Sequence, residues 1–396
     1  MFERRGAAAE ETSFANAGVV APGSVTPWAA PGMPAKVLGS LLSRHAAVKL
    51  SLPLSGDDLT WMWKWWRACK LEIYLVNRAR LQRLAFYSRE RLHHVTTELQ
   101  LEYDRSEGYT VLLRSEKDSR LVQPGLQVLR DAGVAFSEIN ATAVRKIEPA
   151  INPETEFLGG VHLPDDEVAN CRQFALLLKD VARDMGVKFE FNTTVAEVNR
   201  VQAANVLIAG ESSLRQFDRV VMCAGLASAA LLKPLGLKIP MAAVYGYSIS
   251  APIREALNAP RSALMDEHYK VAISRLGNRV RVAGSAEIGG SLMKHRTSSV
   301  QTLYKVLHDW FPGAANLNNS RANTGASVQL WKGARPMLPD GPPLIGDSGI
   351  PGLWLNFGHG SSGWALSCGS ARALADLMSG KNPDVDMEGL GIERLG

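Results

Sequence analysis

The residues best suited to chemistry in this chain lie near its C-terminus, between Trp331 and Trp364. Arg335 stands beside a proline in the string W-K-G-A-R-P-M-L-P-D-G-P-P-L-I-G. A short turn and a buried-looking strand follow, and then the glycine-rich turn G-H-G-S-S-G opens into the last helix. A planar guanidinium binds carboxylates through two parallel hydrogen bonds, and a helix N-terminus attracts anions. The stretch therefore predicts a site for a large anionic or dipolar ligand.

Three tyrosines on nearby predicted strands are candidates for the same site. Tyr245, Tyr247 and Tyr269 could bond a carboxylate or wall a pocket, and packing in a core is an equal explanation for each. Arg335 could likewise form a structural ion pair, and the glycine-rich turn could be a plain entry to a helix. These alternatives stay open on the residues alone.

Length and composition indicate an ordinary globular protein. The 396 residues suffice for two domains, and 46% are hydrophobic while 21% are charged. The net charge of +5 comes from lysines and arginines that are scattered among acids, so nucleic-acid binding is not indicated. The charge supports only a weak attraction to anionic lipid or to small carboxylates.

The cysteines and the N-terminus indicate a reducing compartment. The four cysteines show no paired spacing; they are Cys69, Cys171, Cys223 and Cys368. No signal peptide is expected, because charged residues between Arg4 and Glu11 interrupt any apolar stretch. The longest apolar run, residues 220–232, is too short to span a bilayer. We therefore expect a cytoplasmic protein that is at most peripheral to a membrane.

Two further segments have competing interpretations. The helix expected over residues 59–67 carries four tryptophans in six positions, which indicates either packing between domains or anchoring at a membrane surface. The acids Asp165, Asp166 and Glu167 follow a predicted strand at residues 159–163. No histidine stands at ligand spacing, so we expect a solvated turn there and no metal site.

The remaining pattern predicts alternating helices and strands. Residues 22–34 contain four prolines and should form a loop. Helices are expected at residues 119–132, 172–185 and 302–311, and the pattern after residue 67 continues helical towards residue 101. Strands are expected at residues 108–114, 187–191, 194–198, 205–209 and 219–223. The last of these, apolar and ending in Ala224-Gly225, is typical of a parallel sheet. Antiparallel strands at 241–252, 269–275 and 279–284 predict a second sheet.

Several strings, taken in order, resemble a known family. They are E-T-S-F-A-N-A-G, P-W-A-A-P-G-M-P, L-P-D-D-E-V-A-N-C, D-E-H-Y-K-V-A-I-S-R, G-A-R-P-M-L-P-D-G-P-P-L-I-G and L-W-L-N-F-G-H-G-S-S-G-W. Together they resemble bacterial FAD-dependent D-amino-acid dehydrogenases, small subunit, within the D-amino-acid oxidase and glycine oxidase-like flavoproteins. The resemblance covers essentially the whole chain.

The resemblance implies an α/β fold with two domains. We expect a Rossmann-like FAD-binding domain of the glutathione-reductase type from residues 1–40, 155–235 and 330–396. An α+β substrate domain built on an antiparallel sheet is expected from residues 41–154 and 236–329. Members of the family begin with a strand, a G-x-G-x-x-G loop and a helix ahead of the segment matched by Phe2 and Glu3. This sequence lacks that element, so the expected FAD-binding domain is N-terminally truncated.

The resemblance also implies an activity. A D-amino acid such as D-alanine would lose a hydride from its α-carbon to FAD, and water would convert the imine to a 2-oxo acid and ammonia. Electrons would pass to a quinone or another acceptor at the cytoplasmic face of the inner membrane, and a partner subunit is implied. The alternatives are a related amine substrate (hydroxyproline, sarcosine or glycine) and a fragment without catalysis.

Site residues follow from the same resemblance. Arg335 would bind the substrate carboxylate, and His268 or His359 could tune proton release from the amine. The catalytic candidates are Arg335, Tyr245, Tyr247, Tyr269 and His359, without a general base. The cofactor candidates are Glu3, Arg4, Ser13, Ala15, Asn16, Ala17, Gly18, Val195, Ala224, Gly225, Gly358, His359, Gly360, Ser361, Ser362 and Gly363.

Overall fold

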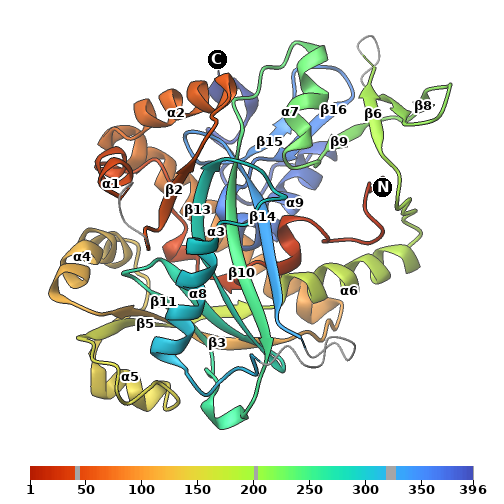
Figure 1. Ribbon diagram of the computed structural model, residues 1–396. Coiled ribbons are helices and arrows are strands. Elements are labelled where there is room, and N and C mark those ends of the chain that lie inside the picture. The colour runs from red at the N-terminus through yellow and green to blue at the C-terminus, as the bar shows by residue number, and fades with distance from the viewer. Residues whose placement is uncertain (41–44, 200–203, 318–326, 396) are drawn as a thin grey trace.

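The computed structural model describes residues 1–40, 45–199, 204–317 and 327–395. Its α-helices are α1 (Met33–Ser40), α2 (Gly56–Ala68), α3 (Leu71–Glu98), α4 (Glu116–Asp131), α5 (Ala141–Ile147), α6 (Cys171–Asp184), α7 (Ala227–Leu232), α8 (Thr297–Trp310) and α9 (Gly363–Met378). Its 3-10 helices are η1 (Thr12–Ala15), η2 (Pro22–Ser24), η3 (Lys233–Leu235), η4 (Ala256–Asn258), η6 (Gly360–Ser362) and η7 (Ile392–Leu395). Figure 1 shows their arrangement.

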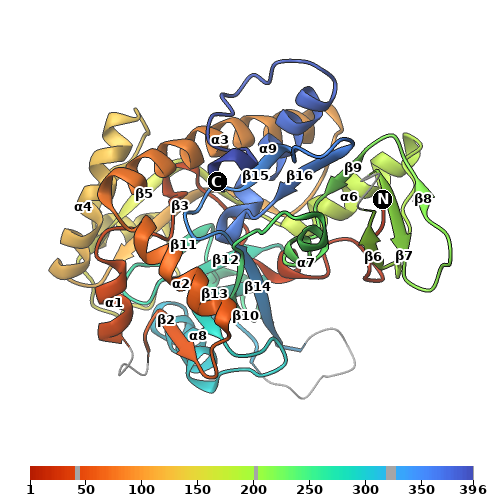
Figure 2. The same cartoon turned by 90° about the horizontal axis from the view of Figure 1, so that it is seen from above.

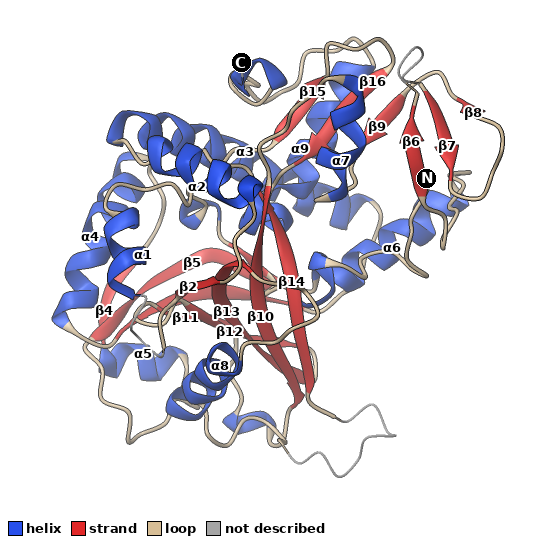
Figure 3. Ribbon diagram, turned by 45° about the horizontal axis from the view of Figure 1, so that its top comes forward, coloured by secondary structure: helices blue, strands red, loops and turns tan. Residues whose placement is uncertain are grey.

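The strands are β1 (Val19–Val20), β2 (Val48–Ser51), β3 (Arg105–Leu113), β4 (Ser137–Asn140), β5 (Gly159–Ala169), β6 (Val195–Val198), β7 (Asn205–Ile208), β8 (Arg215–Gln216), β9 (Val220–Met222), β10 (Ala242–Pro252), β11 (Ala263–Asp266), β12 (Val271–Leu276), β13 (Arg279–Gly289), β14 (Gln329–Met337), β15 (Leu344–Asp347) and β16 (Leu353–Phe357). Within the described ranges they form one ten-stranded sheet and two three-stranded sheets, drawn in red in Figure 3.

The large sheet has the order β1-β5-β3-β11-β12-β13-β10-β14, with β2 beside β13 and β4 beside β5. Most of its pairs are antiparallel, while β3–β11 and β2–β13 are parallel. It contains the three antiparallel strands that the sequence predicted, although β12 begins later and β13 extends further. Figure 2 shows α8 on one side of this sheet and α3 on the other.

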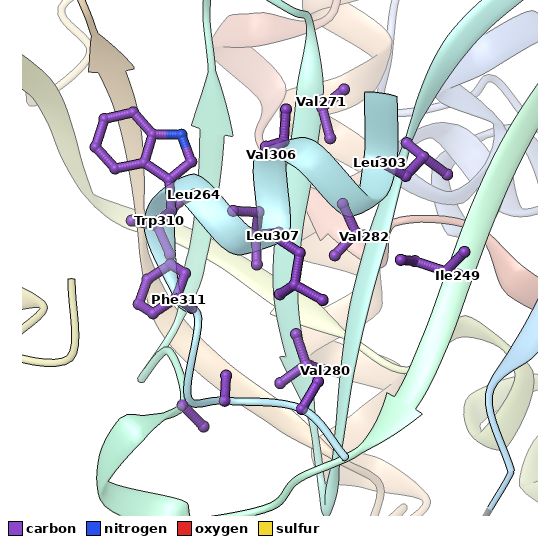
Figure 4. Close-up of a cluster of buried hydrophobic side chains, with 14 of the residues drawn as sticks. Ile249, Leu264, Val271, Val280, Val282, Leu303, Val306, Leu307, Trp310 and Phe311 are labelled. Atoms are coloured by element: carbon purple, nitrogen blue, oxygen red, sulfur yellow. The ribbon is translucent and has the colours of Figure 1, made fainter. Parts of the chain in front are cut away.

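The core beneath α8 fixes which side chains face each way. Val280 and Val282 of β13 pack against Leu303 and Leu307 of α8, as Figure 4 shows. Successive residues of a strand point to opposite faces, so Arg281 between these valines points to the other side. We call the side under the helix the α8 face. The opposite side, which carries Ser274, Arg281, Gly333 and Arg335, is the inner face.

The smaller sheets are made of short strands. β9 pairs with β16 in parallel, with Val220 opposite Leu353, and β15 adds an antiparallel strand to β16. The parallel pairing predicted for residues 219–223 is therefore confirmed. The strand predicted at residues 187–191 is wrong as an extended element, because only Glu190 forms a bridge, parallel to Phe2.

The acidic segment after residue 163 does not form the expected solvated turn. β5 continues through it to Ala169, and Asp166 and Glu167 are buried. Arg105 and His93 both bond Glu167, at 2.7 Å each. Cationic side chains on neighbouring elements thus allow buried acids within the strand. These pairings cannot be recognised from the spacing of residues in the sequence. No group of three or more possible metal ligands occurs in the part of the chain that the structure describes.

The tryptophan-rich helix divides its rings between two environments. Trp61 and Trp65 of α2 are buried, and the indole N–H of Trp61 donates to the carbonyl of Met337 at 2.8 Å. Trp63 and Trp66 are 53% and 60% exposed.

The helical pattern breaks after Ala68 and resumes in α3, and α1 begins at Met33, inside the expected loop. A proline in the first helical turn lacks only a hydrogen bond that the turn could not form.

The large sheet draws strands from both ranges assigned to the predicted domains. β1, β5 and most of β14 come from the residues expected to bind FAD, and the remaining strands come from the residues expected to bind substrate. The domain division therefore stays a prediction whose boundaries do not follow the sheets. Among the described helices, none is long and apolar enough to cross a membrane.

Candidate functional site

Arg335 lies on the inner face of β14 and is held at its tip by one backbone acceptor. Its Nη1 donates to the carbonyl of Ser285 at 3.0 Å. The neighbouring strand leaves room for the guanidinium through Gly246, where an added Cβ would lie 2.4 Å from Nη2 of Arg335. A side chain at that position would push the guanidinium aside, so the glycine is part of the site.

The charge of Arg335 is not balanced by any acid in the part of the protein that the structure describes. No acidic side chain forms an ion pair with it in the described ranges, and burial lowers its pKa to about 10. The group therefore remains protonated near neutral pH. Burial of an unpaired charge is unfavourable, and a bound anion removes that cost. The geometry suits a ligand carboxylate.

Tyr245 and Tyr247 lie on the other side of the sheet. Tyr247 is directly opposite Lys332 in the β10–β14 register, and Lys332 is an odd number of residues from Arg335. The ammonium of Lys332 lies 4.5 Å and 5.2 Å from the centroids of the two tyrosine rings. These tyrosines therefore share the α8 face with Lys332, and the structure does not bring them to Arg335.

A buried acid completes this group on the α8 face. Glu287 lies 2.8 Å from the Lys332 ammonium and accepts hydrogen bonds from Tyr247 and Ser51. Burial alone would raise the pKa of Glu287, but these hydrogen bonds hold it below its usual value. Burial, followed by the bond to Glu287, raises the pKa of Tyr247. Of this network, only the tyrosines were recognisable from the sequence.

Tyr269 and His268 also lie away from Arg335. The ring of Tyr269 contacts Lys305 of α8 and Arg114, and it packs against the core under α8. His268 lies with its Nδ1 3.4 Å from an oxygen of Asp118 at the start of α4. Of the five catalytic candidates, only His359 comes near the inner face with Arg335.

The glycine-rich turn meets the end of the Arg335 strand. His359 forms an antiparallel bridge with Met337, two residues after Arg335. Gly358 has a φ of +82°, and an added Cβ there would lie 2.7 Å from Leu338, so this turn requires glycine. Gly360, Ser361 and Ser362 form a 3-10 turn into α9, whose first residue is Gly363 and whose N-terminus has no side-chain cap. Its first backbone amides are therefore donors for a ligand.

His359 is held neutral beside this turn. Its Nε2 lies 3.1 Å from the hydroxyl of Ser370 on α9, and burial lowers its pKa to about 4. An imidazole in this state carries no charge at physiological pH. It can orient the turn through Ser370, but it does not supply a positive charge to a ligand.

We expect His359 to make the protein less stable as the pH falls. Its pKa is about 4 in the fold and about 6.5 when unfolded, so below pH 6.5 the unfolded chain takes up a proton that the fold does not. The stability loss should extend from pH 6.5 down to about 4. Melting temperatures of H359Q should fall less than those of the unsubstituted protein over this range. H94Q, which changes an exposed histidine on α3, should follow the unsubstituted protein, and equal slopes for all three proteins would contradict the assignment.

The loop at residues 12–18 lies against the same side of the sheet. The hydroxyl of Thr12 donates to the carbonyl of Ala334 at 2.7 Å. Ser274 donates to the carbonyl of Ala17 at 2.6 Å, and Arg281 donates to that of Asn16 at 3.0 Å. The structure thus places the loop with the predicted cofactor residues Ser13, Ala15, Asn16, Ala17 and Gly18 against β14, β13 and β12 on the inner face of the sheet. Sequence reasoning missed Arg281, although an arginine between two valines of a predicted strand is a usable signal.

Two of the predicted cofactor residues, Glu3 and Arg4, lie at the N-terminus. Glu3 accepts a hydrogen bond from the backbone of Arg5, and Arg4 pairs with Glu11. The carbonyl of Glu3 accepts a hydrogen bond from the backbone N–H of Thr193. Thr193 stands two residues before Val195, the first residue of β6. Ala224 and Gly225 follow β9, and Gly225 has a φ of +53° with open space around its α-carbon.

Two surface cavities lie away from Arg335. One of about 620 Å³ follows the end of α6 and the segment 186–191. The other, of about 250 Å³, is lined by Asp104, Arg105, Ser106, Arg261, Arg275 and Gly277. Neither includes a residue of the predicted site, so the site is defined by its side chains and backbone donors.

Comparison with known proteins places these features in a family. The family described as "DAO: FAD dependent oxidoreductase" matches residues 1–377. A D-amino acid dehydrogenase of Bradyrhizobium diazoefficiens is 40% identical over 100% of this chain and 92% of its own length. A D-amino acid dehydrogenase 1 of Mesorhizobium japonicum is 38% identical over 100% of this chain and 93% of its own. Glycine oxidase from Geobacillus kaustophilus has a similar fold, with a TM-score of 0.74 at 18% identity over 99% of this chain and 90% of that one.

Proposed function

This chain belongs to the DAO family of FAD-dependent oxidoreductases, and on that premise we propose that it oxidises D-amino acids to 2-oxo acids and ammonia. Arg335 carries the proposal, because it is a half-buried guanidinium without an acidic partner in the described ranges. A carboxylate is an anion that this planar group binds through two hydrogen bonds. The two relatives that are called D-amino acid dehydrogenases support the class of substrate.

The residues around Arg335 fit a flavin. Several buried polar atoms have no hydrogen-bond partner among the residues that the structure describes: Nε of Arg172 and Arg281, Oγ of Ser248, and Nε1 of Trp331 and Trp364. The uncapped N-terminus of α9 adds free amides beside Gly358 and Gly360. A flavin ring offers oxygens and nitrogens to such donors. We propose that the turn 358–363 and the loop 13–18 hold the ring, and that Glu3, Arg4, Val195, Ala224 and Gly225 lie towards the adenosine and diphosphate.

The chemistry then divides between cofactor and protein. Bound FAD would accept the hydrogen of the substrate α-carbon together with its bonding electrons. The nitrogen lone pair forms the C=N bond as that C–H bond breaks, and water releases ammonia from the imine. Arg335 fixes the carboxylate, which orients the α-carbon. The amides and dipole of α9 stabilise negative charge on the ring. The electrons leave to an acceptor, for which we propose a membrane quinone.

A direct assay tests the proposed activity. The full chain, loaded with FAD, should reduce a dye acceptor with D-alanine and not with L-alanine. A panel with glycine, sarcosine and hydroxyproline compares the related amine substrates. Flavin-loaded protein that reduces no dye with any D-amino acid would overturn the proposal, and a clear preference for sarcosine or hydroxyproline would assign the secondary-amine class instead.

We also propose that the outer side of α2 contacts the membrane that holds the acceptor. Leu59, Trp63 and Trp66 are spaced as one helical face, and each is more than half exposed. The guanidinium of Arg67 stacks over Trp63 at 4.8 Å. Exposed Leu71 and Leu75 follow at the start of α3. Apolar rings beside basic groups suit the headgroup region of anionic lipid.

We expect W63S/W66S to bind vesicles of phosphatidylglycerol at least about tenfold more weakly. Transfer of one large apolar side chain from water is worth roughly 1.5–3 kcal/mol, so the loss of two rings should exceed a factor of ten. Co-sedimentation measures the binding. L257S removes an 84% exposed leucine elsewhere and should bind as the unsubstituted protein does. Equal binding by W63S/W66S would place the lipid contact on another surface or exclude it.

A further inference from the structure

Arg281 is a buried arginine on the inner face, and the proposed chemistry does not use it. The residue is only 9% exposed, and its sole acceptor in the described part of the chain is the carbonyl of Asn16. Its Nε is buried without a partner. Burial of a charged group with so few partners costs folding free energy, so we expect a role of Arg281 beyond the packing of β13.

The charges around Arg281 are positive. Burial, followed by the nearby Arg279, lowers the pKa of Arg281 to about 10, and Arg172 acts in the same direction. Arg172 itself stacks over the ring of Phe14, in the loop 12–18, at 4.3 Å. No carboxylate forms an ion pair with Arg281 among the residues that the structure describes. The loop is therefore backed by a cluster of cations without local compensation.

The hydrogen bonds to the loop determine where its amides point. Arg281 and Ser274 hold the carbonyls of Asn16 and Ala17 towards the sheet. In a trans peptide the carbonyl and the following N–H point in opposite directions, so the N–H groups of Ala17 and Gly18 point away from the sheet. The side chain of Asn16 accepts the N–H of Gly18 at 3.0 Å. The N–H of Ala17 has no acceptor within the described chain, and it is free for a ligand.

The Asn16–Ala17 peptide unit links the buried charge to that free donor. A cation on the carbonyl side polarises the peptide, and hydrogen bonds in such a chain strengthen one another in a low-dielectric interior. The N–H of Ala17 is therefore a stronger donor to a negative acceptor than an ordinary loop amide. Arg281 acts through this peptide without direct contact with the ligand.

We propose that Arg281 is a positioning residue that aims the Ala17 amide at the flavin and makes the bound flavin easier to reduce. This inference rests on the proposed function, because it takes the loop 13–18 as part of the flavin site. The reduced ring gains two electrons and one hydrogen from the substrate and carries the negative charge that the polarised amide stabilises. The oxidised ring gains less from the same donor.

Substitutions at Arg281 separate its charge from its hydrogen bond. R281M removes both, while R281Q keeps a donor for the Asn16 carbonyl and removes the charge. S274A removes the neighbouring anchor at Ala17 without any change of charge. R279M is the matched control, because it removes a half-buried arginine of the same strand that bonds Ser250 and Ser327 instead of the loop.

The measurements are the FAD content and the midpoint potential of the bound flavin, determined by equilibration with a reference dye. For R281M and R281Q we expect the reduction equilibrium to shift at least tenfold towards the oxidised form, a potential about 30 mV lower for a two-electron couple. S274A should release FAD more readily and keep its potential within about 10 mV, which is roughly a twofold shift. R279M leaves the hydrogen bond from Arg281 to the Asn16 carbonyl intact, so it should retain FAD and change the potential by less than about 10 mV.

The possible results distinguish a failure of the role proposed for Arg281 from a failure of the proposed function. Unsubstituted protein that binds no FAD would remove the proposed function. Flavin-loaded R281M or R281Q with an unchanged potential would overturn the role of Arg281 and leave that function standing. If R281M binds no FAD, the potential of R281Q decides. Equal shifts of the potential in R279M and R281Q would assign the effect to the overall positive charge of this region. That result would also overturn the proposal.

Discussion

Replacement of Arg335 by methionine should lower kcat/KM for D-alanine by about 30- to 5,000-fold. Loss of one partner of a buried, charge-assisted pair costs roughly 2–5 kcal/mol, and each 1.36 kcal/mol of barrier corresponds to a factor of ten. The guanidinium is half-buried, and its one hydrogen bond within the described chain is to the Ser285 carbonyl, so we propose that the substrate supplies the missing anion. Dye-linked turnover at several substrate concentrations measures the effect.

Two further variants test whether geometry or charge is lost. R335K keeps the charge without the planar fork and should recover only part of the activity. G246A keeps Arg335 but places a methyl group where the guanidinium lies, so it should lower kcat/KM as well. All three variants should retain FAD, as their absorbance spectra would show. An R335M enzyme with full FAD and unchanged kcat/KM would remove Arg335 from substrate binding.

Replacement of Lys332 by methionine should destabilise the protein by roughly 3–5 kcal/mol, because it leaves the buried Glu287 carboxylate without its counter-ion. The side chains of Lys332 and Glu287 are 1% and 5% exposed. The ammonium also donates to the carbonyls of Ser291 and Lys294, so its loss frees the segment before α8. Urea denaturation of the FAD-loaded protein measures the change.

The double variant K332M/E287Q supplies the control for this mechanism. Removal of both charges of a buried pair costs much less than removal of one, so the double variant should recover a large part of the loss. K270M removes an exposed lysine that pairs with Glu267 and should cost less than about 1 kcal/mol. A double variant as unstable as K332M would show that packing, and not the charge, makes Lys332 important.

Periodicity and glycine punctuation predicted much of the secondary structure. The helices expected over residues 119–132 and 172–185 correspond to α4 and α6, and Gly133 and Gly186 follow them with φ of +66° and +96°. The prediction failed where tertiary partners override local chemistry. Asp166 and Glu167 look like a turn in sequence, but Arg89, His93 and Arg105 pair with them and allow the strand to continue.

Part of the site was predictable because its residues stand close together in the sequence. Arg335 and the turn 358–363 stand close in sequence, so their approach needs only one strand and one turn. The tyrosines of β10 were placed on the wrong side of the sheet relative to Arg335, because their facing depends on the register between β10 and β14. Arg281 depends on a contact with Asn16, 265 residues away, which no local pattern reports.

The strand β14 fixes the distance between the two halves of the site. Arg335 lies two residues before Met337, whose backbone bridges His359 in the turn and also accepts the indole N–H of buried Trp61. A strand advances about 3.3 Å per residue and cannot stretch, so the anion-binding tip and the turn cannot move apart independently. β14 therefore sets a fixed distance between Arg335 and the turn. A β-amino acid places one more carbon, about 1.5 Å of bond, between its carboxylate and its amine-bearing carbon. Such a compound, bound at Arg335, would present the wrong atom at the turn, so we expect the protein to prefer α-amino acids.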